Sequence, residues 1–263
     1  MNTAALSSNT ISTTRYKAAA AHLLICTLVA TSVVALLWYF WFPGLFFEAS
    51  GGRELLLILV GVDVIAGPLL TLIVFDANKK GIKFDMMFIA SLQIAALAYG
   101  LHIMYVARPV YIVYNSDRFD VVTADQIKPE DMEKAKDPEL RLLPLTGPRL
   151  MAAPRPTDPE ENETLKSLEL NGKDVAHMPQ YYVEYTDPVA RKQALKYTKP
   201  VSALDKTSAG LERKLQEIAT RRGTTQDNLV YLPVYAIRGD LAAILEKQSG
   251  DLLEIVVTSG SQI

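Results

Sequence analysis

Among the 263 residues of this chain, the one best placed to do chemistry is Asp63, a carboxylate inside an apolar run. The run extends from Leu55 to Phe75 without another charge, and the stretch around the carboxylate reads GVDVIAGPLL. An ionisable group near the centre of a bilayer costs about 2.5–3.5 kcal/mol on insertion scales, so it normally faces protein or water. Such a carboxylate can serve a proton, bind a substrate, contact a partner or pack inside its own fold.

Outside this run the chain offers little catalytic chemistry. Its histidines, His22, His102 and His177, form no HExxH motif, and its one cysteine, Cys26, lies in an apolar stretch where a thiol is usually inert. No GxSxG motif, phosphate-binding glycine loop or GxGxxG motif is present, and a single cysteine cannot form an intramolecular disulfide. We therefore predict no catalytic residue, no metal site and no cofactor, and a protein that is not an enzyme.

The charge balance argues against a nucleic-acid partner. The whole chain has a net charge of −2, and the residues from 107 onward hold 21 Lys plus Arg against 24 Asp plus Glu. No basic field of the kind that attracts nucleic acid follows from this composition. Nearly all the charge lies in this later part, whereas most of the apolar sequence precedes it.

Three apolar stretches are long enough to cross a bilayer, which takes about 20 residues. They are predicted at about 18–42, 55–75 and 86–106, so that 18–106 forms a three-helix transmembrane domain. The first stretch closes with aromatic residues from Trp38 to Phe42, where an interfacial belt would lie. A cleavable signal peptide fits this stretch poorly, because it is too long and no small-x-small site precedes the aromatic residues.

Positive charges in the short flanking segments predict the orientation. The tail, 1–17, holds Arg15 and Lys17, and the second loop, DANKKGIKFD, holds three lysines; the first loop, PGLFFEASGGRE, has one arginine against two glutamates. We therefore expect the tail and the second loop to be cytoplasmic and everything after Val106 to lie outside. The predicted location is a bacterial inner membrane, crossed three times, with a periplasmic C-terminal domain.

With this orientation, proton transfer by Asp63 lacks partners. His22 lies near the cytoplasmic face and His102 near the outer face, so neither is at the depth of the carboxylate. A single carboxylate is also too few for an aspartyl intramembrane protease, which needs two in apposed positions.

The glycines and the proline of the same stretch favour helix packing. Gly61 and Gly67 let another helix approach closely, and Pro68 frees a backbone carbonyl that a neighbouring donor can satisfy. Two interpretations stay open. Either the stretch packs the three spans of this chain together, with Asp63 neutral and hydrogen-bonded, or it contacts a helix of another protein. Transport and catalysis are less favoured.

The polar part, 107–263, is predicted to be a small α+β domain. Alternating apolar residues predict a β-hairpin over 108–122, with its turn at NSD. Helices are predicted in TADQIKPEDMEKA, in DPEENETLKSLEL, after DP in YTDPVARKQAL and in SAGLERKLQEIATRRG, the last one capped by Ser208. Six prolines predict an extended loop at 137–159. NLVYLPVYAIRGDLAAILEKQSGDLLEIVVTSG predicts three strands, which should join the hairpin in one antiparallel sheet.

A resemblance to a known family is carried by HLLI, WFPGLFFEASGG, LLLILVGVDVIAGPLLTLIVFDANKKGIKFD, LAYGLHIMYVARPVYIVYNSDRFDVV and LPLTGPRL. In this order the segments resemble the TfpX/TfpZ-type family of type IV pilin accessory proteins, also described as pilin assembly chaperones, over about residues 15–155. The resemblance implies an inner-membrane protein that supports the folding, stability or assembly of one major pilin. The implied partners are the transmembrane helix or the periplasmic head of that pilin, the inner-membrane pilus assembly machinery and the lipid bilayer.

Six residues within the resembling segments are candidates for pilin binding: Asp63, Gly67, Pro68, Arg108, Pro109 and Arg118. The second span would offer a groove of small residues with Asp63 as a polar anchor, and the periplasmic sheet would supply specificity. Two other classes are weighed against this hypothesis. An envelope enzyme that modifies pilin would need a polar cluster in the periplasmic domain, and a regulatory or sensory protein would need a cytoplasmic partner, because DANKKGIKFD is too small to house an output domain.

Overall fold

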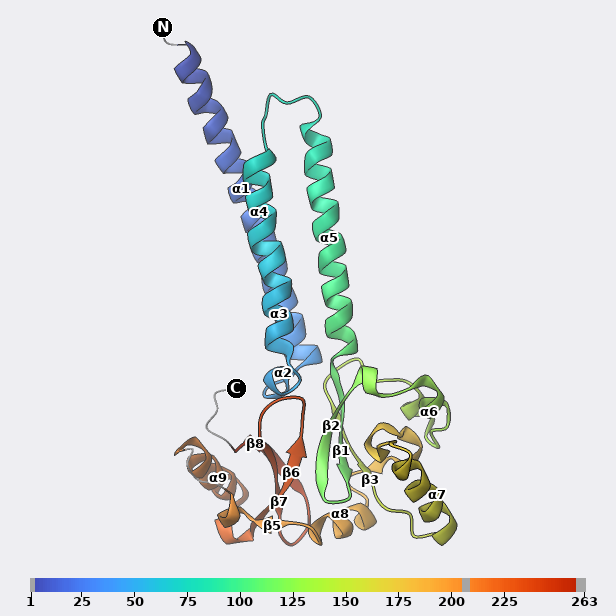
Figure 1. Ribbon diagram of the computed structural model, residues 1–263. Helices are drawn as coiled ribbons and strands as arrows, with labels where there is room; N and C mark the ends of the chain where they lie inside the picture. The colour runs from blue at the N-terminus through green and yellow to red at the C-terminus, as the bar shows by residue number, and fades with distance from the viewer. Residues whose placement is uncertain (1–2, 205–208, 259–263) are drawn as a thin grey trace. The chain divides into compact units, whose positions relative to one another are not determined.

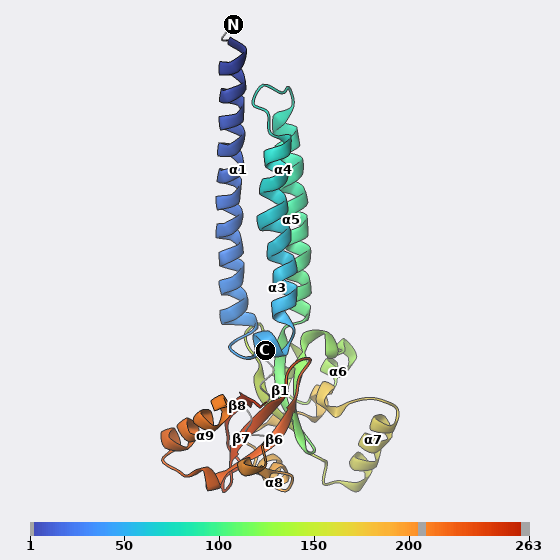
Figure 2. The same cartoon turned by 60° about the vertical axis from the view of Figure 1, so that its left-hand side comes forward.

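The computed structural model describes residues 3–204 and 209–258, which form two compact units (Figures 1 and 2). A helical unit comprises Met1–Pro43 and Gly52–Val106, and a sheet unit comprises Gly44–Gly51 and Ala107–Ile263. The loop between the first two apolar stretches thus belongs to the sheet unit, although it is flanked in sequence by the helical one.

The helical unit is built from α1 (Thr3–Leu36) with the π-turn η1 (Leu37–Trp41), α3 (Gly52–Gly61), the π-turn η2 (Val62–Ala66), α4 (Gly67–Val74) and α5 (Ile82–Val106). Thr14–Trp41, Gly52–Val74 and Ile82–Val106 are each long and apolar enough to cross a membrane, and we call them spans one, two and three. Even in span two only 22% of the apolar window is buried inside the protein. Most of each helix surface therefore needs lipid or another helix to cover it.

Span two is interrupted at its centre by the π-turn η2, which holds Asp63. In a π-turn the carbonyl of residue 63 would accept from residue 68, but Pro68 has no N–H to give. Gln93 of α5 replaces this donor, since its Nε2 lies 3.1 Å from the Asp63 carbonyl oxygen. This is the neighbouring donor that the glycine–proline step requires.

The short helix α2 (Phe46–Ala49) anchors the loop after span one in the sheet unit. Ala49 is fully buried in a hydrophobic cluster of that unit, where Leu45 and Phe46 also pack. The backbone N–H of Arg238 donates to the Ala49 carbonyl at 2.9 Å. A segment treated in the sequence as a connecting loop is therefore part of the sheet unit's core.

The described part of the sheet unit contains one eight-stranded sheet in the order β4-β3-β1-β2-β6-β7-β8, with β5 paired to β6. Its strands are β1 (Pro109–Asn115), β2 (Arg118–Thr123), β3 (Arg149–Ala153), β4 (Val183–Glu184), β5 (Lys199–Pro200), β6 (Leu229–Tyr235), β7 (Leu241–Glu246) and β8 (Leu252–Val257). The predicted hairpin is β1–β2, and the three predicted C-terminal strands are β6–β8. They share one sheet, as expected.

The prediction that this sheet is antiparallel is wrong. β1 pairs in parallel with β3, and β2 pairs in parallel with β6. Only a tight turn forces antiparallel pairing, whereas the long connections from β1–β2 to β3 and to β6 allow the chain to return in the same direction.

The prediction that 137–159 is an extended loop with little regular structure is also wrong in part. The segment contains a 3₁₀ helix, η4 (Pro138–Arg141), and strand β3. The five residues of β3 lie between Pro148 and Pro154, so each keeps the N–H that a strand ladder needs.

The predicted helices are present as α6 (Pro129–Glu133), α7 (Pro159–Leu170), α8 (Pro188–Leu195) and α9 (Ala209–Arg222). Asp158 and Asp187 accept hydrogen bonds from the first turns of α7 and α8, as N-caps do. The predicted cap Ser208 lies outside the described residues. Short 3₁₀ turns complete the unit: η3 (Ala124–Gln126), η5 (Val175–His177), η6 (Pro179–Tyr181), η7 (Val201–Ala203) and η8 (Gln226–Asn228).

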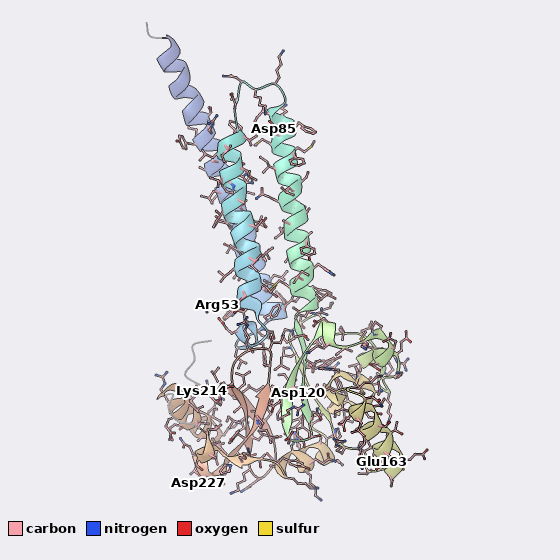
Figure 3. The ribbon with its side chains drawn as sticks, in the orientation of Figure 1. Arg53, Asp85, Asp120, Glu163, Lys214 and Asp227 are labelled. Carbon is pink, nitrogen blue, oxygen red and sulfur yellow. The ribbon has the colours of Figure 1, made fainter. Side chains whose placement is uncertain are left out.

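A salt bridge that fastens α9 to β8 predicts a loss of stability in acid. Glu254 lies 2.8 Å from the Nζ of Lys214, which is labelled in Figure 3, and 2.6 Å from an Nη of Arg221. Burial alone would raise the pKa of Glu254, but the hydrogen bonds from these two cations outweigh it and lower that pKa. A lowered folded-state pKa gives stability that is present above the unfolded-state pKa and lost as the pH falls through the folded-state pKa.

We therefore expect Glu254→Gln to be less stable than the natural chain at neutral pH and equally stable in acid, with the curves converging below about pH 4. Thermal unfolding of the full chain in detergent across this range measures the difference. Glu133→Gln, at an exposed carboxylate with no ion pair in the described structure, serves as the matched control. Parallel pH profiles for Glu254→Gln and the natural chain would contradict the prediction.

Candidate functional site

A polar seam joins the three spans and runs from span two's π-turn to Thr71 in α4. It comprises His22, Cys26, Asp63, Thr71 and Gln93, which come from all three spans. The Nε2 of Gln93 lies 3.1 Å from the Asp63 carbonyl oxygen and 3.7 Å from the Cys26 sulfur. The Nδ1 of His22 lies 2.5 Å from the Thr71 hydroxyl. As expected from depth, His22 does not pair with Asp63.

The Asp63 side chain is buried but incompletely satisfied. It is 8% exposed, and its Oδ1 has no hydrogen-bond partner in the described structure. The packing interpretation requires a buried, hydrogen-bonded carboxyl group; the burial is present, but this oxygen lacks the bond. A buried polar atom without a partner costs about 1–3 kcal/mol, and a helix that donates to this oxygen would have to displace the side chains that cover it.

The two glycines of the stretch differ. A Cβ built on Gly67 would lie 1.9 Å from the Nε2 of Gln93, so the absence of a side chain allows span three to approach. Pro68 is buried beside it. A Cβ on Gly61 would meet nothing within 4 Å. Gly67 is therefore the packing glycine, and Gly61 faces away from the described contacts.

An apolar groove of about 300 Å³ lies between spans two and three, between the seam and the start of α3. Leu55, Leu59 and Val62 line it from span two, and Tyr99 and Gly100 line it from span three. Val62 and Tyr99 are exposed to 47% and 69%. Because these apolar side chains lie open, the groove needs an apolar occupant, either lipid or a helix.

The candidate residues Arg108 and Pro109 are buried in the sheet unit. Arg108 is 2% exposed, and its Nε and Nη2 lie 3.3 and 3.1 Å from the carbonyl oxygen of Pro144. Pro109 is the first residue of β1 and is also buried. Arg108 holds the start of β1 against the proline-rich segment, and burial closes the side chains of both residues to direct contact with a partner.

We expect Arg108→Ala to destabilise the sheet unit by about 2 kcal/mol, because it leaves the Pro144 carbonyl without these donors and opens a cavity where the buried arginine was. Arg141→Ala is the matched control, since Arg141 makes the same two-nitrogen contact with the Ala135 carbonyl, at 3.3 Å, from an exposed position. Urea unfolding of the full chain in detergent compares the two. Equal losses would show that burial of Arg108 contributes nothing.

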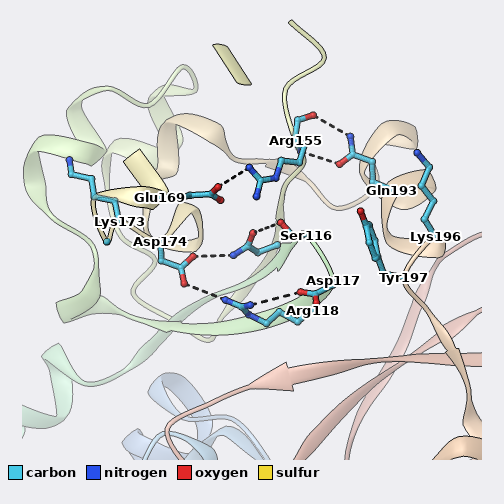
Figure 4. Close-up of a pocket in the computed structure, with 12 residues that line it drawn as sticks. Ser116, Asp117, Arg118, Arg155, Glu169, Lys173, Asp174, Gln193, Lys196 and Tyr197 are labelled. Atoms are coloured by element: carbon cyan, nitrogen blue, oxygen red, sulfur yellow. Dashed lines mark hydrogen bonds and ion pairs between the residues drawn. The ribbon is translucent and has the colours of Figure 1, made fainter. Parts of the chain in front are cut away.

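A second site is a polar cleft of about 800 Å³ in the sheet unit (Figure 4). Its lining comes from the β1–β2 turn at 115–118, from Arg155 after β3, from 169–174 at the end of α7 and from 193–197 at the end of α8. We call it the cleft. Arg118, the last candidate from the sequence, lies in its wall.

Arg118 is the centre of an ion-pair cluster in this wall. Its Nε lies 3.0 Å from Asp120, and its guanidinium also lies 3.5 Å from Asp174 and 3.8 Å from Asp117. The same guanidinium stacks over the Tyr235 ring at 4.7 Å. Burial raises the pKa of Asp120, and the hydrogen bond from Arg118 only partly opposes this. These contacts fix the position of the Arg118 side chain.

The structure brings together residues that sequence reasoning did not. Arg118 lies with Arg155, Lys173 and Lys196 around the cleft, whereas Arg108 and Pro109 lie elsewhere in the sheet unit. Asp63, Gly67 and Pro68 share the helical unit. One part of the cleft has a signal in the sequence, because NSD predicts a hairpin turn. The structure places this two-residue turn in the cleft wall, with Ser116 at a φ of +58°, a backbone region that favours glycine.

Within residues 3–204 and 209–258, no group of three or more His, Cys, Asp or Glu side chains is placed to hold a metal ion. The side chains of the seam and of the cleft are held in place by hydrogen bonds and ion pairs.

Fold and sites define a class of protein with three helices of membrane length followed by a mixed-sheet domain. Relatives of this chain are known. Fimbrial assembly proteins of serogroups I and E1 from Dichelobacter nodosus are 27% and 26% identical to it over 230 residues, which is 86% of this chain and 88% of each relative. A shorter fimbrial assembly protein of the same bacterium, from serogroups C1 and C2, is 30% identical over 116 residues, 43% of this chain and 88% of the relative. The chain belongs to this fimbrial assembly protein family. No protein-family model and no solved structure matches it.

Proposed function

We propose that this chain is a non-enzymatic inner-membrane accessory protein of type IV pilus assembly, which stabilises one specific major pilin and promotes its incorporation into pili. The observation that carries the proposal is the likeness to fimbrial assembly proteins over 230 residues, because a match of that length includes most of both units. The sequence segments that resemble the TfpX/TfpZ-type pilin accessory proteins support pilin as the partner.

The helical unit supplies a contact for an apolar helix. Span two offers its groove beside span three, and the unpartnered Oδ1 of Asp63 provides a polar anchor in the same unit. Lysines at 79, 80 and 83 in the turn before α5 favour a cytoplasmic location for that turn. In this orientation the sheet unit is periplasmic. The further partners of the chain are the inner-membrane assembly machinery and the lipid bilayer.

Deletion of the gene tests the proposal. We expect less pilin in the inner membrane and fewer surface pili, with both restored by a plasmid copy of the natural gene. Transcript of the pilin gene is measured in parallel, because a regulatory protein would lower the transcript whereas a chaperone lowers only the protein. Unchanged amounts of pilin and of pili in the deletion strain would refute the proposal.

A further inference from the structure

Two exposed lysines of the cleft lack an ion-pair partner in the described structure. Each of the three carboxylates that line it pairs with an arginine: Glu169 with Arg155 at 2.8 Å, and Asp117 and Asp174 with Arg118. Lys173 and Lys196, by contrast, have no ion-pair partner in the described structure, and both are exposed. Figure 4 shows the two lysines on different segments of the lining. Because Arg118 also pairs with Asp120, the four cations and four carboxylates of the cleft and its wall balance, and the unpaired positive charge is local to Lys173 and Lys196.

The walls of the cleft are fixed by side-chain bonds between segments distant in sequence. The Gln193 side chain accepts from the Arg155 N–H at 3.0 Å and donates to the Arg155 carbonyl at 3.2 Å. The Asn115 Nδ2 donates to Asp174 at 3.0 Å. A cleft tied in this way exists before a ligand arrives, which lowers the entropic cost of binding.

At the tip of the β1–β2 hairpin, which forms part of this wall, Ser116 has a backbone conformation that is unfavourable for a residue with a side chain. Ser116 has a φ of +58°, which costs an L-residue about 1–2 kcal/mol relative to glycine. Its hydroxyl lies 3.2 Å from the Asn115 side-chain oxygen, so the serine also orients the asparagine that holds Asp174. Retained strain of this kind is concentrated at ligand-binding positions.

We propose that the cleft binds an acidic segment of the pilin head, whose carboxylates pair with Lys173 and Lys196; this inference rests on the proposed function. Arg155 adds donors, because only its Nη1 has a side-chain acceptor in the described structure. Tyr197, 54% exposed and in the same lining, gives a ring for the apolar part of the segment. The volume of about 800 Å³ lies within the range of ligand sites.

A carboxylate suits this cleft better than a phosphate does. Phosphate recognition favours the two-pronged guanidinium, but Arg118 is engaged by carboxylates of the chain and Arg155 already gives one of its nitrogens to Glu169. The free cations are lysines, which act as point charges and accept the varied geometries of carboxylates on a polypeptide. Several separate cations also fit several acidic side chains better than one compact anion.

Photo-crosslinking in cells that produce the pilin tests the inference on the full chain. A crosslinking amino acid replaces Tyr197, and captured pilin peptides are identified by mass spectrometry. We expect capture of a peptide that contains Asp or Glu. Lys173→Glu with Lys196→Glu should lower the yield by about tenfold or more, since like charges then face each other. Lys173→Arg with Lys196→Arg should keep it.

The matched control is Lys192→Glu with Lys247→Glu, which makes the same change in net charge at exposed lysines outside the cleft. This variant should leave the yield unchanged. A second crosslinker at Ile65, an exposed residue of span two, separates the two proposals. Capture of pilin from Ile65 but not from Tyr197, or capture from Tyr197 that charge reversal does not lower, overturns the cleft inference and leaves the proposed function standing. Capture of pilin from neither position refutes both.

Discussion

Gly67→Leu is expected to disrupt the packing of span two against span three, whereas Gly61→Leu is expected to be tolerated. A Cβ on Gly67 already lies 1.9 Å from the end of the Gln93 side chain, and a leucine adds three further carbons. Overpacking of this kind costs about 1–3 kcal/mol, and we expect the upper end because Gln93 also loses its bond to the Asp63 carbonyl. Gly61, with nothing within 4 Å of its Cβ position, is the matched control in the same span.

The cause of this loss can be isolated with Gly67→Ala. The smaller side chain displaces only the Gln93 amide, so we expect a cost of about 1 kcal/mol, close to that of an interhelical hydrogen bond. Gln93→Ala removes both the amide and the bond, and Gly67→Ala should then add almost nothing. A double-mutant cycle, measured by SDS unfolding of the full chain in mixed micelles, gives this coupling. Additive costs for the two substitutions would show that Gly67 does not act through Gln93.

The membrane-length helices could be predicted from the sequence because their signal is local. A bilayer demands a long apolar stretch, and each of the three predicted stretches lies almost wholly within a helix of the structure. The hairpin, the helices that start at proline and the last three strands were likewise predictable from turn and cap residues. Their local preferences agree with the final fold.

The pairing of distant strands could not be predicted in this way. β2 pairs with β6 across a connection of more than a hundred residues, and no local pattern states whether the returning strand runs parallel or antiparallel. Strand β3 was hidden because prolines on both sides suggested a loop. The two parallel pairings exist because helices and 3₁₀ turns fill the connections and bring the chain back in the same direction.

The candidate residues illustrate the same limit. Arg108 was selected because it lies within a segment that resembles the pilin accessory family, yet it is 2% exposed and bound to the Pro144 carbonyl. The cleft needs four separate segments to converge, so Lys173 and Lys196 gave no signal in the sequence beyond two ordinary surface lysines. Asp63 was identifiable from sequence alone, because a carboxylate in an apolar run is costly wherever the chain places it.

The largest functional effect is expected from Asp63→Leu, which should remove pilin stabilisation while the chain itself stays folded. Leucine abolishes the cost of a buried carboxyl group in span two, so the amount of this chain in the membrane should stay the same or increase. Under the proposed function, pilin would lose its polar anchor, and an interhelical hydrogen bond of about 1–2 kcal/mol corresponds to a loss of about tenfold in bound pilin. Co-purification of pilin with the detergent-solubilised variant measures this loss.

Asp63→Asn separates hydrogen bonding from charge. The amide keeps an oxygen that accepts a hydrogen bond and has nearly the shape of the carboxyl group, so this variant should retain most of the bound pilin if Asp63 acts as a neutral acceptor. If Asn fails as completely as Leu, the carboxylate charge is itself required, and the partner must bring a cation to mid-depth in the membrane. Full pilin binding by Asp63→Leu would contradict both forms of the anchor. It would leave the groove between spans two and three as the contact that packs a pilin helix, because that groove does not include Asp63.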